Sequence, residues 1–309
     1  MDSNFEIPSG RDLALVTRDL LPLLGSTDSR LREGSLEILG HWGEAGRYTD
    51  VELRAIGERM ASNISLGLGE SGTESVFLRS FSALILEMVI QTDDVRNLGA
   101  GAGREPFLSR DEALEWSEAA LAAFASEEDG RGFVDGRGWA HALAHKADLL
   151  GTLARGRHLD APRLERVLAA IADRLARPAE IILAFEEEYR LVRTAVHVLL
   201  RNEVQSELLH SWIEALSRMP DGKTWGTVLG LHECDQAGNR ARVNVRNFLR
   251  SLYFVLLWGM RGPGDAAESA NPYHAYYDRP IHARHVLLAD IEQALRGMNR
   301  PTYKSEESK

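Results

Sequence analysis

Two histidines and an aspartate in one short stretch are the residues best suited to chemistry. They are His141, His145 and Asp148. Their spacing of four and then three residues predicts that they share one face of a helix, which we place at about residues 135–155. Two imidazole nitrogens and a carboxylate oxygen are ligands that zinc, iron or manganese takes in proteins. At 1.5 Å per residue the three positions spread over about 10 Å, so another helix is a better source of a third ligand than Asp148.

A metal site is one of three interpretations that this polar face leaves open. Ala142 stands where a zinc-protease helix has a glutamate directly after the first histidine, so that motif is absent. Arg137 falls on the same face as His141, His145 and Asp148, and together they would equally line a metal-free polar groove. The third interpretation is a structural polar face, with His145 and Asp148 as an (i, i+3) pair. We expect the apolar face to lie opposite, with Trp139, Leu143, Leu150 and Leu153.

Glu188 is a second candidate, on a helix expected at 178–201. It lies at the edge of an apolar stripe formed by Ile181, Phe185, Tyr189, Val192, Val196 and Leu199. A carboxylate in that place is costly unless it is paired or bound to a ligand. We expect a salt bridge to Arg79 or Arg131. In an enzyme, Glu188 would instead serve as general base or as a further metal ligand.

Other familiar motifs are missing from the sequence. Cys234 is the only cysteine, which excludes an internal disulfide and any multi-cysteine zinc site. The glycines at 99–103 do not form a phosphate loop, because no strand precedes them and no Gly-Lys-Ser/Thr follows. We expect them to form a surface loop. No nucleophile elbow and no dinucleotide fingerprint occurs.

Composition indicates the general class of protein. The 309 residues include 44% hydrophobic side chains, and the net charge of −10 is the wrong sign for a nucleic-acid binder. The longest apolar run, near 252–260, is too short to span a membrane, and the acidic N-terminus does not resemble a signal peptide. Only four of the 36 basic residues are lysines. We therefore expect a cytoplasmic bacterial protein with neither a nucleic-acid nor a membrane partner.

The pattern of apolar residues predicts an all-α fold. Apolar residues recur every three and four positions in about eleven segments, and no alternating run is long enough for a strand. The turn-like stretches 27–30 and 92–96 suggest stacked α-hairpins, as in a HEAT-like solenoid, with a compact multi-helix bundle as the alternative. We expect a single domain over 1–298 and a disordered polar tail over 299–309.

Three segments resemble a known bacterial family. They are residues 127–150 with the pattern Gly138-Trp139-Ala-His141 through Asp148-Leu149, residues 74–86, and more weakly residues 187–191. In these segments the chain resembles the domain of unknown function 2785, and the resemblance covers most of residues 10–300. It implies a mainly helical fold and implies no activity.

Two classes of function remain open on sequence grounds. In the first, the chain is a helical binding scaffold whose polar groove of Arg137, His141, His145 and Asp148, with Arg131 and Glu188 as further binding residues, holds a small polar ligand or a protein partner. In the second, His141, His145 and an acid such as Glu188 form a metal-dependent hydrolase. We favour the scaffold, because a fold by itself is no evidence of chemistry.

Overall fold

The computed structural model describes residues 5–7, 9–230, 232–261 and 272–298. These residues form twelve α-helices, two short 3₁₀ helices and one hairpin of two strands. Within this described part there is no sheet of three or more strands, so the prediction of an all-α fold is confirmed. The predicted polar tail at 299–309 lies outside the described residues.

The chain divides by its internal contacts into two compact units, Met1–His158 and Leu159–Lys309. The division falls between the helices α6 (Ala142–Arg155) and α7 (Ala161–Ala176). The single domain expected from the sequence stays a prediction, which depends on whether the two units unfold together.

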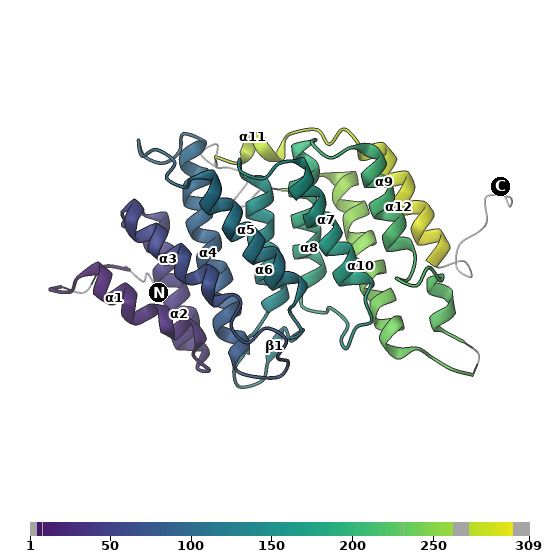
Figure 1. The fold of residues 1–309 in the computed structure, drawn as a ribbon, viewed down its shortest axis with the longest axis horizontal. Coiled ribbons are helices and arrows are strands. Elements are labelled where there is room, and N and C mark those ends of the chain that lie inside the picture. The colour runs from purple at the N-terminus through teal and green to yellow at the C-terminus, as the bar shows by residue number, and fades with distance from the viewer. Residues whose placement is uncertain (1–4, 8, 231, 262–271, 299–309) are drawn as a thin grey trace. The chain divides into compact units, whose positions relative to one another are not determined.

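The first unit contains six helices and the hairpin (Figure 1). Its helices are α1 (Leu13–Leu20), α2 (Ser29–Glu44), α3 (Asp50–Asn63), α4 (Ser75–Asn97), α5 (Arg110–Ala125) and α6, with a 3₁₀ turn at Leu21–Gly25. Helix α4 packs against α2, α3 and α6, while α5 packs against α3 and α6. Helix α4 is thus the core helix of this unit.

Helix α4 is also the only described helix with the length and apolar composition to cross a membrane. Two-thirds of its most apolar window, 67%, is buried inside the protein. The apolar side chains that include Val76, Phe77, Phe81, Ile85 and Val89 form part of the core. Packing within the first unit therefore accounts for its composition.

The second unit contains α7, α8 (Glu187–Arg201), α9 (Ser206–Ser217), α10 (Gln236–Trp258), α11 (His274–Tyr277) and α12 (Arg284–Met298), with a 3₁₀ turn at Trp225–Val228. Helix α10 packs against α7, α8 and α12, and α9 packs against α7 and α12. Buried apolar side chains from these helices, among them Phe248, Leu252 and Ile291, form its core.

Several predicted helix boundaries are wrong. The helix expected from residue 135 begins at Ala142, because Gly136 and Gly138 adopt positive φ angles that an α-helix does not accommodate. The helix expected from residue 178 begins at Glu187, after an irregular stretch that leaves Ile181 and Phe185 exposed. The stretch 92–96, which we interpreted as a turn, lies inside α4. Stretch 27–30 contains the start of α2, with Asp28 as its N-cap.

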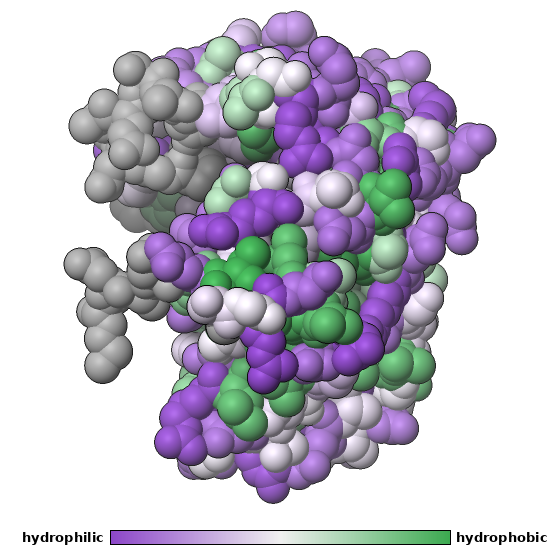
Figure 2. All heavy atoms as spheres, turned by 90° about the vertical axis from the view of Figure 1, so that its left-hand side faces the viewer, coloured by the Kyte–Doolittle hydropathy of each residue, from purple (hydrophilic) through white to green (hydrophobic). Residues whose placement is uncertain are grey.

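The surface of the first unit has apolar side chains among polar ones. Figure 2 shows a group of hydrophobic residues surrounded by hydrophilic ones on the side where α1 and α2 lie. The exposed apolar residues of α1 and α2 are Leu15 and Leu31. The glycine-rich segment at 99–103 is a mostly exposed loop with positive φ at Gly99 and Gly103, as predicted.

Candidate functional site

A short hairpin precedes the helix that carries the candidate residues. Strand β1 (Phe133–Val134) pairs antiparallel with β2 (Gly138–Trp139), which places Phe133 opposite Trp139. Gly138 has a φ of 76°, and a Cβ atom there would lie 2.8 Å from Cβ of Ser29 and 3.1 Å from Nη2 of Arg32. Only glycine therefore allows the hairpin to approach α2 this closely.

The buried side chain of Arg32 binds the backbone of the hairpin on the side that faces the protein interior. Its Nη2 donates to the carbonyl oxygens of Arg137 at 2.6 Å and Trp139 at 3.1 Å, and its Nη1 donates to Ser26 at 2.7 Å. The guanidinium also lies over the ring of Phe77, 4.2 Å from its centroid. Burial lowers the pKa of Arg32, but arginine keeps its charge in proteins. The carbonyls of the hairpin thus solvate a buried cation.

The outer side of the hairpin presents aromatic and charged groups to solvent. Phe133 and Trp139 are 47% and 37% exposed, and their rings pack edge to face at 5.2 Å. The exposed side chain of Arg137 forms an ion pair with Glu74. His141 stacks on Trp139 with ring centroids 4.8 Å apart.

The structure brings His141 and His145 together, as predicted, but by a different route. Their ring centroids lie 5.5 Å apart. His141 does not lie in the helix: it is the residue before α6 and has a left-handed backbone with a φ of 50°. Such a conformation costs free energy in a residue other than glycine, although histidine tolerates it better than most. Each of the two histidines is only 9% exposed.

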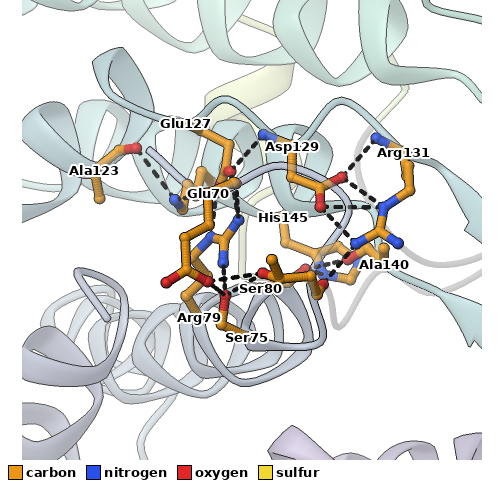
Figure 3. A network of polar contacts seen from close by, with 12 residues as sticks. Glu70, Ser75, Arg79, Ser80, Ala123, Glu127, Asp129, Arg131, Ala140 and His145 are labelled. Carbon is orange, nitrogen blue, oxygen red and sulfur yellow. Dashed lines mark hydrogen bonds and ion pairs between the residues drawn. The ribbon is translucent and has the colours of Figure 1, made fainter. Parts of the chain in front are cut away.

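Polar contacts hold His145 on the side of α4 (Figure 3). Its Nδ1 lies 2.8 Å from the Oγ atom of Ser80, and Ser80 in turn donates its hydroxyl hydrogen to the carbonyl oxygen of Ala140. The ring of Phe81 packs edge to face on His145 at 5.3 Å. Because Ser80 is fully buried and its proton is directed at Ala140, this pair is not the serine–histidine arrangement of a hydrolase.

The prediction that His141 and Trp139 lie on opposite faces of one helix is wrong, because neither residue lies in α6. Every residue of this helix is buried, including Asp148 at 9% exposure. Trp139, placed on the apolar face, lies in the hairpin and is partly exposed. Among the residues that the structure describes, no group of three His, Cys, Asp or Glu side chains is placed to hold a metal ion.

A buried ionic network lies beside this site and was missed in the sequence. Nε and Nη2 of Arg79 donate to the carboxylate of Glu127 at 2.8 and 2.9 Å, and Nζ of Lys146 donates to it at 2.6 Å (Figure 3). All three side chains are fully buried. Burial raises the pKa of Glu127, but its hydrogen bond with Arg79 and the charge of Lys146 outweigh that effect and lower it overall. The sequence signal that could have revealed the network is Arg79, a charged residue within the apolar stretch of α4.

Arg131, predicted to bind a ligand, has a structural partner. Its guanidinium binds Asp129 and donates to the carbonyl of Thr73 at 2.7 Å, while Asp129 also accepts from the backbone N–H of Gly72 at 3.0 Å. The contacts tie the segment before α4 to the segment before the hairpin. These contacts give Arg131 a structural role, because they join the two segments.

Glu188 is not paired as predicted. Arg79 binds Glu127 and Arg131 binds Asp129, so each has another partner. Glu188 lies in the first turn of α8, in the second unit. Burial raises its pKa, and the neighbouring carboxylates of Glu187 and Glu186 raise it further.

Comparison with known proteins identifies the family. No curated protein and no solved structure matches the chain. A family model described as a protein of unknown function, DUF2785, matches residues 64–254. The match exceeds half of the chain and contains the hairpin, both histidines and the buried ionic network. The chain therefore belongs to the DUF2785 family of proteins of unknown function.

Proposed function

We propose that this chain is a binding protein and that its recognition surface is formed by Phe133, Arg137 and Trp139, the hairpin surface, with the buried His141 stacked on Trp139 beneath it. Its ligand is a small polar molecule or a polar segment of a protein partner. We also propose that this chain is a cytoplasmic bacterial scaffold built of HEAT-like repeats. The packing of α3 on α4 and of α5 on α6, as pairs of consecutive helices, supports the repeats.

The position of Arg32 is the observation that carries this proposal. A two-stranded hairpin is marginally stable by itself in water. Here its two carbonyl groups accept hydrogen bonds from a guanidinium that is fully buried. Burial of an arginine is costly, so a hairpin that moved away would leave Nη2 of this buried cation without its two carbonyl acceptors. The hairpin surface is consequently rigid before a ligand arrives, which reduces the entropy lost on binding.

The composition of the hairpin surface also suits recognition. Tryptophan and arginine are enriched among residues that dominate binding energy at interfaces. The ring of Trp139 offers an apolar face, and the ion pair of Arg137 with Glu74 offers both donors and acceptors beside it. Together they favour a ligand that has one flat face and several polar groups.

A metal-dependent hydrolase is the alternative that the sequence leaves open. The paired imidazoles of His141 and His145 support it, but a catalytic metal site has three protein ligands. No third His, Cys, Asp or Glu of the described residues is placed to complete one. We therefore expect protein purified without chelator to contain far less than one metal ion per chain. Zinc, iron or manganese at one per chain, lost on His141→Ala, would instead support the hydrolase.

The binding proposal is tested by a screen of small polar compounds against ¹⁵N-tryptophan-labelled protein. We expect the compounds that bind to shift the indole resonance of Trp139, one of six tryptophans, and to lose affinity in Trp139→Ala and Arg137→Ala. Trp258→Ala is the matched control, because that side chain is also exposed but lies in α10. Compounds that bind Trp139→Ala as tightly as wild type would contradict the proposal.

A further inference from the structure

We infer that copies of this chain associate head to tail through two patches of opposite charge on the second unit. The acidic patch consists of apolar side chains beside two acids: Glu180, Ile181, Ile182, Phe185, Glu186 and Tyr189. The basic patch consists of apolar side chains between two arginines: Arg250, Phe254, Leu257, Trp258 and Arg261. The inference goes beyond the proposed function, because the hairpin surface belongs to the first unit.

The acidic patch exposes four large apolar side chains in the stretch before α8 and in its first turn. They are Ile181, Ile182, Phe185 and Tyr189. Between Arg177 and Arg190 the sequence has four glutamates and no basic residue. Glu180 and Glu186 are exposed, and neither forms an ion pair with another residue that the structure describes. A group of exposed apolar side chains with a polar rim marks a site of interaction.

Helix α10 holds the backbone of this stretch in place. The buried side-chain amide of Asn244 accepts from the N–H of Leu183 at 2.9 Å and donates to the carbonyl of Ile181 at 3.2 Å. Nε of Arg240 donates to the carbonyl of Ala179 at 2.7 Å. Leu183 is thereby held in the core while its apolar neighbours are exposed. Because the stretch is ordered before a partner arrives, less entropy is lost on binding.

The basic patch follows one face of α10 and continues just past its end. Positions 250, 254, 257 and 258 share this face, because they are separated by whole turns of a helix. Trp258 is 76% exposed and stacks on Phe254 with ring centroids 4.8 Å apart. Arg250 and Arg261 are exposed at the two ends, and neither forms an ion pair within the described part of the chain. Tryptophan and arginine are enriched among the residues that dominate binding energy.

A second copy of the chain is the partner that fits both patches. Each patch has an apolar centre, and their charges are opposite, which favours the pairing. The two patches cannot meet within one chain, since Asn244 anchors the acidic patch and Trp258 lies about 20 Å further along α10 at 1.5 Å per residue. An interface between two different patches is heterologous, so a dimer still has one unused patch of each kind. Association therefore continues past the dimer.

Sedimentation velocity of the full chain tests the inference from about 1 μM to about 1 mM, the range in which weak interfaces dissociate. We expect the sedimentation coefficient of wild type to rise with concentration beyond that of a dimer. Phe185→Asp and Trp258→Asp should each remain monomeric, because each puts a charge into an apolar contact. Leu208→Asp is the matched control and should associate like wild type, since this exposed leucine of α9 lies outside both patches. Circular dichroism checks that the variants keep their helices.

An equimolar mixture of Phe185→Asp and Trp258→Asp is the decisive measurement. The first variant keeps the basic patch and the second keeps the acidic patch, so a single interface can form between them. We expect a dimer with one copy of each variant and no larger species. A mixture that stays monomeric would overturn the inference, and so would a monomeric wild type, whose patches would then serve other partners. Loss of association in only one variant would also overturn it, because a patch would then pair with itself.

The charge of the basic patch is tested separately. Arg250→Glu places a carboxylate opposite the acidic patch, and we expect it to weaken association about tenfold. Arg59→Glu, on an exposed position of α3, is the matched control and should leave association unchanged. Equal association of Arg250→Glu and wild type would overturn the pairing of the two patches.

Discussion

At the scale of single residues, the buried charged side chains are the feature of the first unit that is most sensitive to substitution. Arg79, Glu127 and Lys146 are fully buried, and the one carboxylate accepts from both cations. Burial lowers the pKa of Lys146, and the charge of Glu127 opposes that change. Glu127 is the partner that both cations share, so its removal would leave two buried positive charges without a carboxylate.

We expect Glu127→Gln to destabilise the protein by about 3–5 kcal/mol, the usual cost of breaking a buried ion pair from one side. Glu115→Gln is the matched control, since this side chain of α5 is exposed and its change should alter stability by less than about 0.5 kcal/mol. Urea unfolding at pH 7 measures both. Equal stability of the two variants would show that the network contributes little.

Asp93 predicts a dependence of stability on pH. Its carboxylate accepts from the backbone N–H groups of Phe107 at 2.6 Å and Leu108 at 2.8 Å and pairs with Arg157. Burial raises the pKa of Asp93, but the nearby imidazole of His158 and the hydrogen bond from Arg157 outweigh burial and lower the pKa from 3.8 to about 2. Because the folded protein holds this proton more weakly than the unfolded chain, the contribution is complete above pH 3.8 and is lost as pH falls through about 2.

We expect the stability difference between wild type and Asp93→Asn to shrink by about 2 kcal/mol between pH 5 and pH 2, following the linkage of pKa and stability. Urea unfolding at several pH values measures it. Asp111→Asn, on an exposed position of α5, should follow wild type over the same range. A constant difference for Asp93→Asn would mean that the carboxylate titrates alike in the folded and unfolded chain.

The candidate site could be predicted only in part at this scale. The spacing of His141 and His145 correctly brought the two rings together. Ser80 and Arg32 could not be identified, because their contacts join positions 65 and 105 residues apart in the chain. A buried polar residue on an amphipathic helix has the same sequence signature as an exposed one, and only tertiary contacts distinguish them.

At the scale of elements, local signals predicted helices where caps were strong. Ser109 and Glu112 form a capping box at the start of α5. The hairpin was missed because each strand has only two residues, and its stability depends on Arg32 rather than on alternation of side chains. The late start of α8 was missed because the apolar spacing continues through a segment that is not helical.

Close packing between elements gives a sharp test at Gly57 on α3. A Cβ atom there would lie 2.2 Å from the ring of Trp116 on α5, and that ring is buried. We expect Gly57→Ala to destabilise the protein by about 1–3 kcal/mol, the usual cost of overpacking. Gly40→Ala on α2 is the matched control, since nothing lies within 4 Å of its Cβ position. It should stabilise by about 0.5–1 kcal/mol, because alanine favours a helix interior.

The sign of these two changes is the informative measurement. Both variants replace glycine by alanine within a helix, so intrinsic helix propensity acts equally on each. A denaturation midpoint below that of wild type in Gly57→Ala and above it in Gly40→Ala would confirm that α3 and α5 are in contact at Gly57. Stabilisation by both would place the two helices further apart than the structure has them.

At the scale of the whole molecule, the connection between the two units decides how they unfold. Only residues 156–160 separate α6 from α7, which is short for a flexible interdomain linker. Both sides of the division at 158–159 are bonded within their own units: Arg157 donates to the carbonyl of Leu108 at 3.1 Å, and the carbonyl of Leu159 accepts from Arg201 at 3.1 Å. The segment between α6 and α7 is therefore short and hydrogen-bonded on both sides of the division, so it does not act as a flexible linker.

We therefore expect the full chain to unfold in one cooperative transition, with the calorimetric and van't Hoff enthalpies equal. Differential scanning calorimetry measures both enthalpies, and limited proteolysis provides the structural check. In Gly57→Ala, which lies in the first unit, the single transition should move as a whole to lower temperature. A variant in which only part of the heat absorption moved would show that the first unit melts alone. Two protease-resistant halves that meet near residue 158 would show the same, and the chain would then have two domains.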